Sequence, residues 1–258
     1  MTEAALADLA LTSDKTLVVG NAAANFAREA ERVRTELRAG TTALMPAREP
    51  EGTWTARTLC ERAMFFADAS RREAKTAVEG ALAACSIDKR EARRSQHVLS
   101  PLGKKRALLA AALVTNPRRV VVCDPLSGLE DDAAEAMATL LVTALAGRVW
   151  VVFASFVSLW SPLARAADEV VCALGNAVVA RGPVAALAAA ESALRVRGVG
   201  NLEAFVTLAQ ERGLGPTRVL DGVDLTWPAG RDRNELFALG AEAAFDIDEM
   251  APRIPGIT

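Results

Sequence analysis

The residues best suited to chemistry lie in one stretch of the chain, from Leu99 to Glu130. Ser100-Pro101 predicts the start of a helix, because serine caps a helix N-terminus and proline fits the first helical position. The apolar run Arg119–Cys123 predicts a buried strand that delivers Asp124 at its end. A carboxylate in this position could support a magnesium ion from its second coordination shell. This stretch therefore predicts a helix followed by a strand that ends in one candidate metal-associated carboxylate.

Cysteine and histidine form no pattern of metal ligands or catalytic partners. The sequence contains one histidine, His97, which precedes the helix start and is expected to be structural or exposed to solvent. No CxxC pair or nearby histidine accompanies the cysteines, which are Cys60, Cys85, Cys123 and Cys172. We interpret them as reduced thiols that lie mostly in the core. No metal site is expected from these residues.

Strands and helices alternate through most of the chain. Short apolar runs predict buried strands, and apolar residues at helical spacing predict the helices between them. The predicted strands are 16–19, 41–45, 119–123 and 148–153, followed by a hairpin of 169–173 and 177–180. The predicted helices are 26–37, 56–69, 71–84, 101–115, 130–146 and 159–166. This alternation predicts an α/β fold with a mostly parallel sheet that is covered by helices on both faces.

The length of 258 residues suits a main domain with a small appendage. Because the composition shifts after about residue 190, we expect a main domain over 1–190 and a small α+β domain over 191–258. The net charge is −2, and the basic stretches are interleaved with glutamate, so no nucleic-acid partner is expected. No signal peptide is recognised, and the longest apolar runs, 107–114 and 149–157, are too short to span a bilayer. A cytoplasmic protein is expected.

The stretch from Leu99, which reads LSPLGKKRALLAAALVTNPRRVVVCDPLSGLE, resembles the ATP-binding-cassette (ABC) transporter ATPases. In that family a signature LSGGQ opens a helix, and a strand ending in Asp-Glu follows, then Pro and Ser-Gly-Leu. Residues 167–183 resemble the family's closing strands, and 192–258 resembles the accessory domain of ABC-2-type exporter subunits. The resemblance covers about 15–187 and is strongest over 99–187. It implies a P-loop NTPase-like fold with a helical subdomain at about 55–98.

The phosphate-binding motif of that family, GxxxxGK[ST], is altered here. Backbone N–H groups and a lysine of this motif hold phosphates, and its hydroxyl holds Mg²⁺. The matching stretch reads Gly20-Asn21-Ala22-Ala23-Ala24-Asn25-Phe26. Ala24 stands for the second glycine, Asn25 for the lysine and Phe26 for the hydroxyl residue. Loss of one such group costs on the order of 10² to 10³ in rate, and the loss of several together is expected to prohibit hydrolysis. Binding of Mg²⁺-ATP is expected to be absent or weak.

The other diagnostic positions of the family have also changed. Pro125 follows Asp124 where a glutamate would polarise water, and we align Glu130 with the next acidic position. Phe156 follows Ser155 where the family has histidine, and the coupling glutamine would fall at Pro46 or Ala47. Pro101 and Leu102 occupy the two glycine positions of the signature, so Ser100 is expected to serve mainly as a helix cap. No catalytic residue, cofactor or metal ligand is therefore expected.

These changes predict a pseudo-ATPase that docks on an ABC-type membrane permease and pairs with a second ATPase subunit or another copy. It would lie at the inner face of the membrane through that permease. Residues around Trp54, Phe65 and Phe66 are candidate contacts, although core packing is the favoured role of the two phenylalanines. Three alternatives stay open: weak turnover at a composite site that uses Ser100, a soluble regulator unrelated to transport, and a chance match on a generic doubly wound protein.

Overall fold

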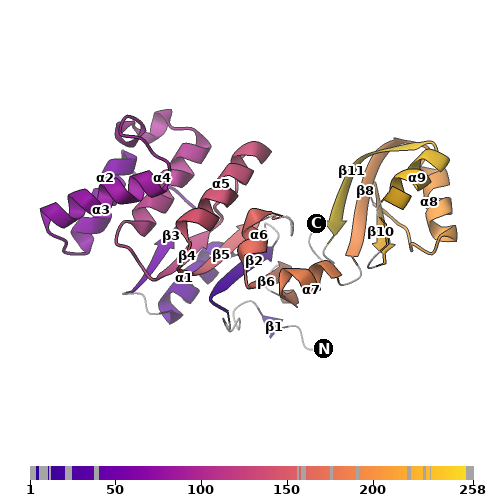
Figure 1. Cartoon of the computed structure of the whole chain (residues 1–258), viewed down its shortest axis with the longest axis horizontal. Helices are drawn as coiled ribbons and strands as arrows, with labels where there is room; N and C mark the ends of the chain where they lie inside the picture. Colours follow the sequence, from indigo (N-terminus) through magenta and orange to yellow (C-terminus); the bar gives the residue numbers. More distant parts are fainter. Residues whose placement is uncertain are drawn as a thin grey trace. The chain divides into compact units, whose positions relative to one another are not determined.

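The computed structural model describes residues 4–5, 11, 13–20, 25–37, 41–155, 157, 161–174, 177–189, 192–219, 222–228, 231–232 and 234–253. The chain divides into two compact units, Met1–Arg181 and Gly182–Thr258 (Figure 1). Three of the predicted site positions, Asn21, Ala24 and Phe156, lie outside the described residues.

The first unit is built on a seven-stranded sheet with the order β1-β7-β6-β2-β5-β4-β3. Its strands are β1 (Ala4–Ala5), β2 (Lys15–Gly20), β3 (Thr42–Met45), β4 (Arg119–Cys123), β5 (Val149–Ser155), β6 (Glu169–Leu174) and β7 (Ala177–Gly182). All neighbours from β6 to β3 run parallel, and β1 pairs with β7 in the antiparallel direction. The predicted mostly parallel sheet is therefore confirmed.

Helices cover both faces of this sheet, as Figure 1 shows for α1 (Phe26–Glu36) on one side and α5 (Asp131–Ala144) and α6 (Pro162–Ala166) on the other. Side chains alternate between the two faces of a strand, so Val18, Val121 and Phe153 share one face. They form one core cluster with Phe26 and other buried residues of α1. This packing fixes α1 against that face of the sheet.

Three helices, α2 (Ala56–Phe66), α3 (Arg71–Ala84) and α4 (Pro101–Leu113), contact one another beside β3. Short 3₁₀ turns at Glu91–Arg93 and Gln96–Val98 connect α3 to α4. The N-terminus of α4 confirms the predicted start, because the Ser100 hydroxyl accepts a hydrogen bond from the Gly103 N–H at 3.1 Å and Pro101 is the first helical residue. We call α2, α3 and α4 the helical layer.

The second unit contains α7 (Val184–Ala189), β8 (Ser192–Gly200), α8 (Leu202–Glu211), β9 (Thr217–Val219), β10 (Gly222–Trp227), α9 (Asn234–Glu242) and β11 (Phe245–Arg253). Its sheet has the order β11-β8-β10-β9, with every neighbouring pair antiparallel. From β8 onward this is the βαββαβ succession of ferredoxin-like folds. The last strand, β11, pairs with β8 along the sheet and has a bulge between Ile247 and Glu249.

Candidate functional site

The candidate site lies at the carboxyl ends of β2, β3, β4 and β5, the edge at which parallel α/β sheets bind ligands. A cavity of about 610 Å³ opens there. Its lining includes four of the predicted positions, namely Asn25, Phe26, Ala47 and Asp124, together with Ser155. The structure therefore brings together residues that lie up to 130 positions apart in the chain.

Phe26 anchors the start of α1 in the core of the sheet. Its side chain is 5% exposed, and its ring centroid lies 5.7 Å from that of Phe153 on β5. The ring also lies against Gly20, where an added Cβ would come within 2.8 Å of it. Only glycine permits this approach, so Gly20 and Phe26 fit each other. An aromatic ring therefore stands at the position that the resemblance aligns with a metal-coordinating hydroxyl.

Asn25 serves as the N-cap of α1. Its side-chain oxygen accepts a hydrogen bond from the Arg28 N–H at 3.3 Å, which satisfies one of the free N–H groups at the helix start. Asn25 itself is exposed. At the lysine position of the resemblance, the chain thus offers a neutral amide that is engaged with its own helix.

Asp124 ends β4 in a left-handed backbone conformation, with φ of 49°. Aspartate tolerates this region better than most residues, and bonds to β5 hold it there. Its N–H donates to the Phe153 carbonyl at 2.7 Å, and its Oδ1 accepts from the Ser155 N–H at 3.2 Å. The next residue, Pro125, is buried and has no group that could accept a proton. Asp124 therefore joins β4 to β5 and is followed by no general base.

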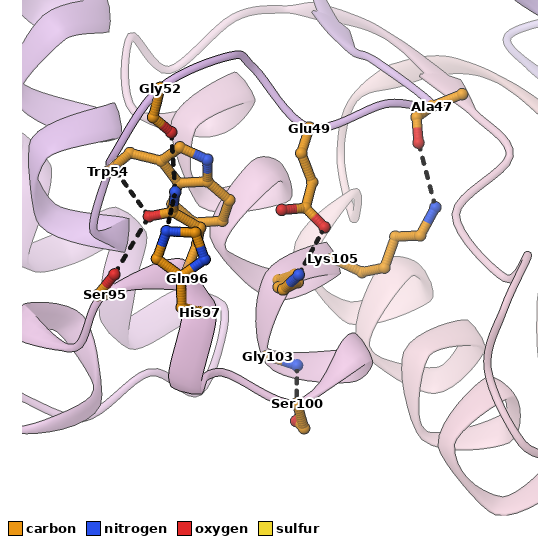
Figure 2. Close-up of polar contacts among 11 residues, drawn as sticks. Ala47, Glu49, Gly52, Trp54, Ser95, Gln96, His97, Ser100, Gly103 and Lys105 are labelled. Atoms are coloured by element: carbon orange, nitrogen blue, oxygen red, sulfur yellow. Dashed lines mark hydrogen bonds and ion pairs between the residues drawn. The ribbon is translucent and has the colours of Figure 1, made fainter.

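Lys105 of α4 reaches the same edge of the sheet. Its Nζ donates to the Asp124 carbonyl at 2.8 Å. The same Nζ lies 3.5 Å from the Ala47 carbonyl (Figure 2). Burial lowers the pKa of Lys105, and the negative charge of Asp124 opposes that shift. Burial also raises the pKa of the neighbouring Cys123 thiol to about 11. In the sequence analysis Lys105 is only one residue of the run that resembles the ABC ATPases. Its position in α4, one helical turn after Pro101, was the available signal that it lies near the N-terminus of that helix.

Two further predicted positions do not contribute to this cavity. Ser100 is exposed, and its hydroxyl is engaged as the cap of α4. Glu130 is exposed and begins α5 without a side-chain capping bond. The described residues contain no group of three or more His, Cys, Asp or Glu side chains that could hold a metal ion. The four cysteines are all buried and free, as predicted.

The link between β3 and α2, residues 46–55, crosses from this site to the helical layer (Figure 2). In this link, Oε1 of Glu49 forms an ion pair with Nζ of Lys104 at 3.0 Å. Further along, the Gln96 side chain accepts from the Trp54 N–H at 2.7 Å and donates to the Gly52 carbonyl at 2.8 Å. The Gln96 N–H also donates to the Trp54 carbonyl at 3.0 Å. Sequence reasoning did not select Gln96, because nothing local marks its partners 42 and 44 residues away.

The aromatic residues near the link have the opposite environments to those expected. Trp54 is only 1% exposed, so it packs in the core and is not a surface contact. Phe65 and Phe66, for which core packing was favoured, are 76% and 81% exposed at the end of α2. Their rings meet edge to face with centroids 5.8 Å apart. The favoured core role of these two residues is therefore wrong.

The sequence matches no family model. It is similar to the cobalt import ATP-binding protein CbiO of Rhodobacter capsulatus, with 32% identity over 156 residues that make up 58% of this chain and 54% of that protein. The chain therefore spans about half the length of this relative. No helix among the described residues is long and apolar enough to cross a membrane.

Two solved structures resemble this one. The structure of cbiO1 from Clostridium perfringens, part of the ABC transporter complex cbiONQ, matches with a TM-score of 0.56 and 15% identity, covering 70% of this chain and 82% of that chain. The dimeric structure of a post-hydrolysis state of the ATP-binding cassette MJ0796, bound to ADP and Pi, matches with a TM-score of 0.51 and 14% identity, covering 68% and 88%. At these identities the likeness is one of fold.

Proposed function

We propose that this chain is an ABC-type ATP-binding subunit that has lost the ability to hydrolyse ATP. Its homology to an ABC ATP-binding subunit and its P-loop NTPase fold support the first part of this proposal. In this proposal it docks on a membrane permease at the inner face of the membrane. It pairs there with a second ATPase subunit or with another copy of itself. The observation that carries the proposal is the burial of Phe26 against Gly20 and Phe153.

The described side chains at the positions that the resemblance aligns with the phosphate-binding motif do not suit Mg²⁺-ATP. A metal-bound triphosphate needs a hydroxyl or water ligand for the ion and a cation beside the phosphates. The ring of Phe26 supplies no ligand, and the amide of Asn25 supplies no charge and is engaged as a cap. Activation of the attacking water also needs a proton acceptor after Asp124, and Pro125 has none. Each such loss costs on the order of 10² to 10³ in rate, which supports an inactive subunit.

The partner side of the proposal is supported by the two structures and by α2. One relative is part of a transporter complex, and the other is a dimer. On this chain, Phe65 and Phe66 border a groove of about 670 Å³ with Thr58, Glu61 and Arg62. Two adjacent exposed aromatic rings are costly to leave in water, and such patches mark protein contacts. We assign this groove to the permease.

Catalytic inactivity is tested on the purified full chain by calorimetric titration with Mg²⁺-ATP and by phosphate release. We expect no binding heat at millimolar nucleotide and no turnover above buffer. Asp124→Asn separates contamination from real activity, because contaminating turnover is the same in both proteins. Turnover that is present in the natural chain and lost in Asp124→Asn would show that the subunit is an enzyme.

The partner is tested by recovery of the tagged chain from native membranes. A membrane permease should be recovered with the natural chain and lost with the Phe65→Ser/Phe66→Ser double variant. The matched control is Val98→Ser, which changes another large exposed apolar residue outside this groove. Recovery of no permease would contradict the docking role. Turnover that needs a partner and disappears in Ser100→Ala would instead favour the composite site.

A further inference from the structure

The link between β3 and α2 is fastened at three points to one continuous segment, residues 95–105 (Figure 2). We propose that Lys105 and Gln96 form an internal brace that holds the helical layer in one position on the sheet without any ligand. This inference rests on the proposed function. A subunit that does not turn over ATP must hold its partner-facing helices by contacts within its own chain.

The first end of the brace is the Lys105 ammonium group. It belongs to α4, yet it donates to the Asp124 carbonyl after β4 and lies beside the Ala47 carbonyl after β3. Its charge is attracted by the carboxylates of Asp124 and Glu49, which favour its protonated form. Bonds from a charged donor are stronger than neutral ones. One side chain thus ties a helix of the layer to two strand ends of the sheet.

The second end of the brace is Gln96, which is 5% exposed. Its backbone and side chain together make three hydrogen bonds to Gly52 and Trp54. A single bridge between Thr55 and Ser95 continues this pairing. Trp54 is itself buried, so water does not reach its backbone N–H. Loss of the Gln96 side chain would therefore leave this backbone N–H without a hydrogen-bond acceptor.

The middle contact, between Glu49 and Lys104, differs in strength from the two ends. Both side chains of this ion pair are about one third exposed (39% and 30%), so solvent screens it. Lys104 and Lys105 are neighbours on α4 with the same side chain. They therefore provide a matched pair, in which only Lys105 should matter for the brace.

The consequence is mechanical. Movement of α4 relative to the sheet would have to break the bonds of Lys105 at the strand ends and move the link with it. Rotation of α2 would have to separate Trp54 from Gln96. The helical layer is thus coupled to the sheet through residues 95–105. The exposed rings of Phe65 and Phe66 would accordingly be presented in a fixed orientation.

Hydrogen exchange measured by mass spectrometry on the full chain tests the brace. In Lys105→Met, peptides that cover residues 46–55 should exchange about tenfold faster than in the natural chain, whereas in Lys104→Met they should change by less than about twofold. Gln96→Ala should accelerate the Gly52–Thr55 part of the link. Unchanged exchange of the link in both Lys105→Met and Gln96→Ala would overturn the proposal.

Two measurements keep this test decisive. If Lys105→Met also accelerates exchange in β4 and β5, this variant is globally destabilised. Lys105→Gln, whose side chain is a shorter donor, is then used instead, and the link should again exchange about tenfold faster than in the natural chain. Addition of Mg²⁺-ATP to the natural chain should leave link exchange unchanged. A change upon ATP addition would contradict the expected absence of Mg²⁺-ATP binding. The variants test the brace without nucleotide, so the two ideas fail separately.

Discussion

Replacement of Phe26 by serine would place a hydroxyl at the position that the resemblance aligns with the metal-binding residue of ABC ATPases, and the structure predicts that the chain cannot accommodate the change. The ring is 5% exposed and packs on Gly20 and Phe153. Removal of a buried aromatic ring costs about 3–5 kcal/mol. The new hydroxyl gains little, since it starts a helix whose first free N–H groups are partly capped by Asn25. We therefore expect Phe26→Ser to lower the free energy of unfolding by about 4 kcal/mol.

The matched control is Phe65→Ser, the same chemical change at a ring that is 76% exposed, for which we expect a change within about 0.5 kcal/mol. The assay is urea unfolding read from the hydrogen exchange of β4 and β5 peptides, because these report the first unit separately from the second. A loss of less than about 1 kcal/mol in Phe26→Ser relative to the control would refute the claim that this ring is part of the core. Binding of Mg²⁺-ATP by a folded Phe26→Ser would show that a single residue blocks the site.

Three further outcomes follow from the same structure. Ser100→Ala should cost about 1 kcal/mol, because the Gly103 N–H at the start of α4 loses its acceptor, and exchange of α4 peptides measures this. Burial raises the pKa of Cys60 and of Cys85 to about 12. The contribution of each thiol to the free energy of unfolding is therefore complete below pH 9 and is lost as the pH rises toward 12. Urea titrations should show a decrease of about 1.4 kcal/mol per thiol at pH 10, which should be absent in the Cys60→Ser and Cys85→Ser variants. Asp224→Ala would leave Arg195 without its bidentate partner and should lower the stability of the second unit by about 3 kcal/mol, measured by exchange of β8 and β10 peptides.

The sequence predicted the fold through periodic patterns that need no knowledge of distant contacts. Apolar runs marked the central strands, and the Ser100-Pro101 pair marked the start of α4. The wrong prediction for Phe65 and Phe66 was avoidable from the same periodicity. The buried stripe of α2 runs through Ala56, Leu59, Cys60 and Met64, and the two phenylalanines follow its last member on the other side of the helix.

Other features of the site depend on contacts that no local pattern encodes. Gln96 reads as an ordinary polar residue before a helix, yet its bonds to Gly52 and Trp54 place it in the core. Lys105 is visible as a lysine on α4, but only the register of β3 with β4 brings two strand ends within its reach. Such residues become functional through the fold, so they are found only after it is known.

Three side chains at the candidate site make contacts within the protein, and in the proposed function these replace contacts of a nucleotide. The amide oxygen of Asn25 meets an N–H group at the start of α1, the position at which helices bind phosphate. The ring of Phe26 fills the space between Gly20 and β5. The ammonium of Lys105 supplies a positive charge beside Asp124, as a metal ion would. Each of these contacts lies within the protein and needs no bound nucleotide. If the proposed function holds, loss of catalysis and independence from nucleotide arise from the same side chains, because each of them is already engaged by its own protein.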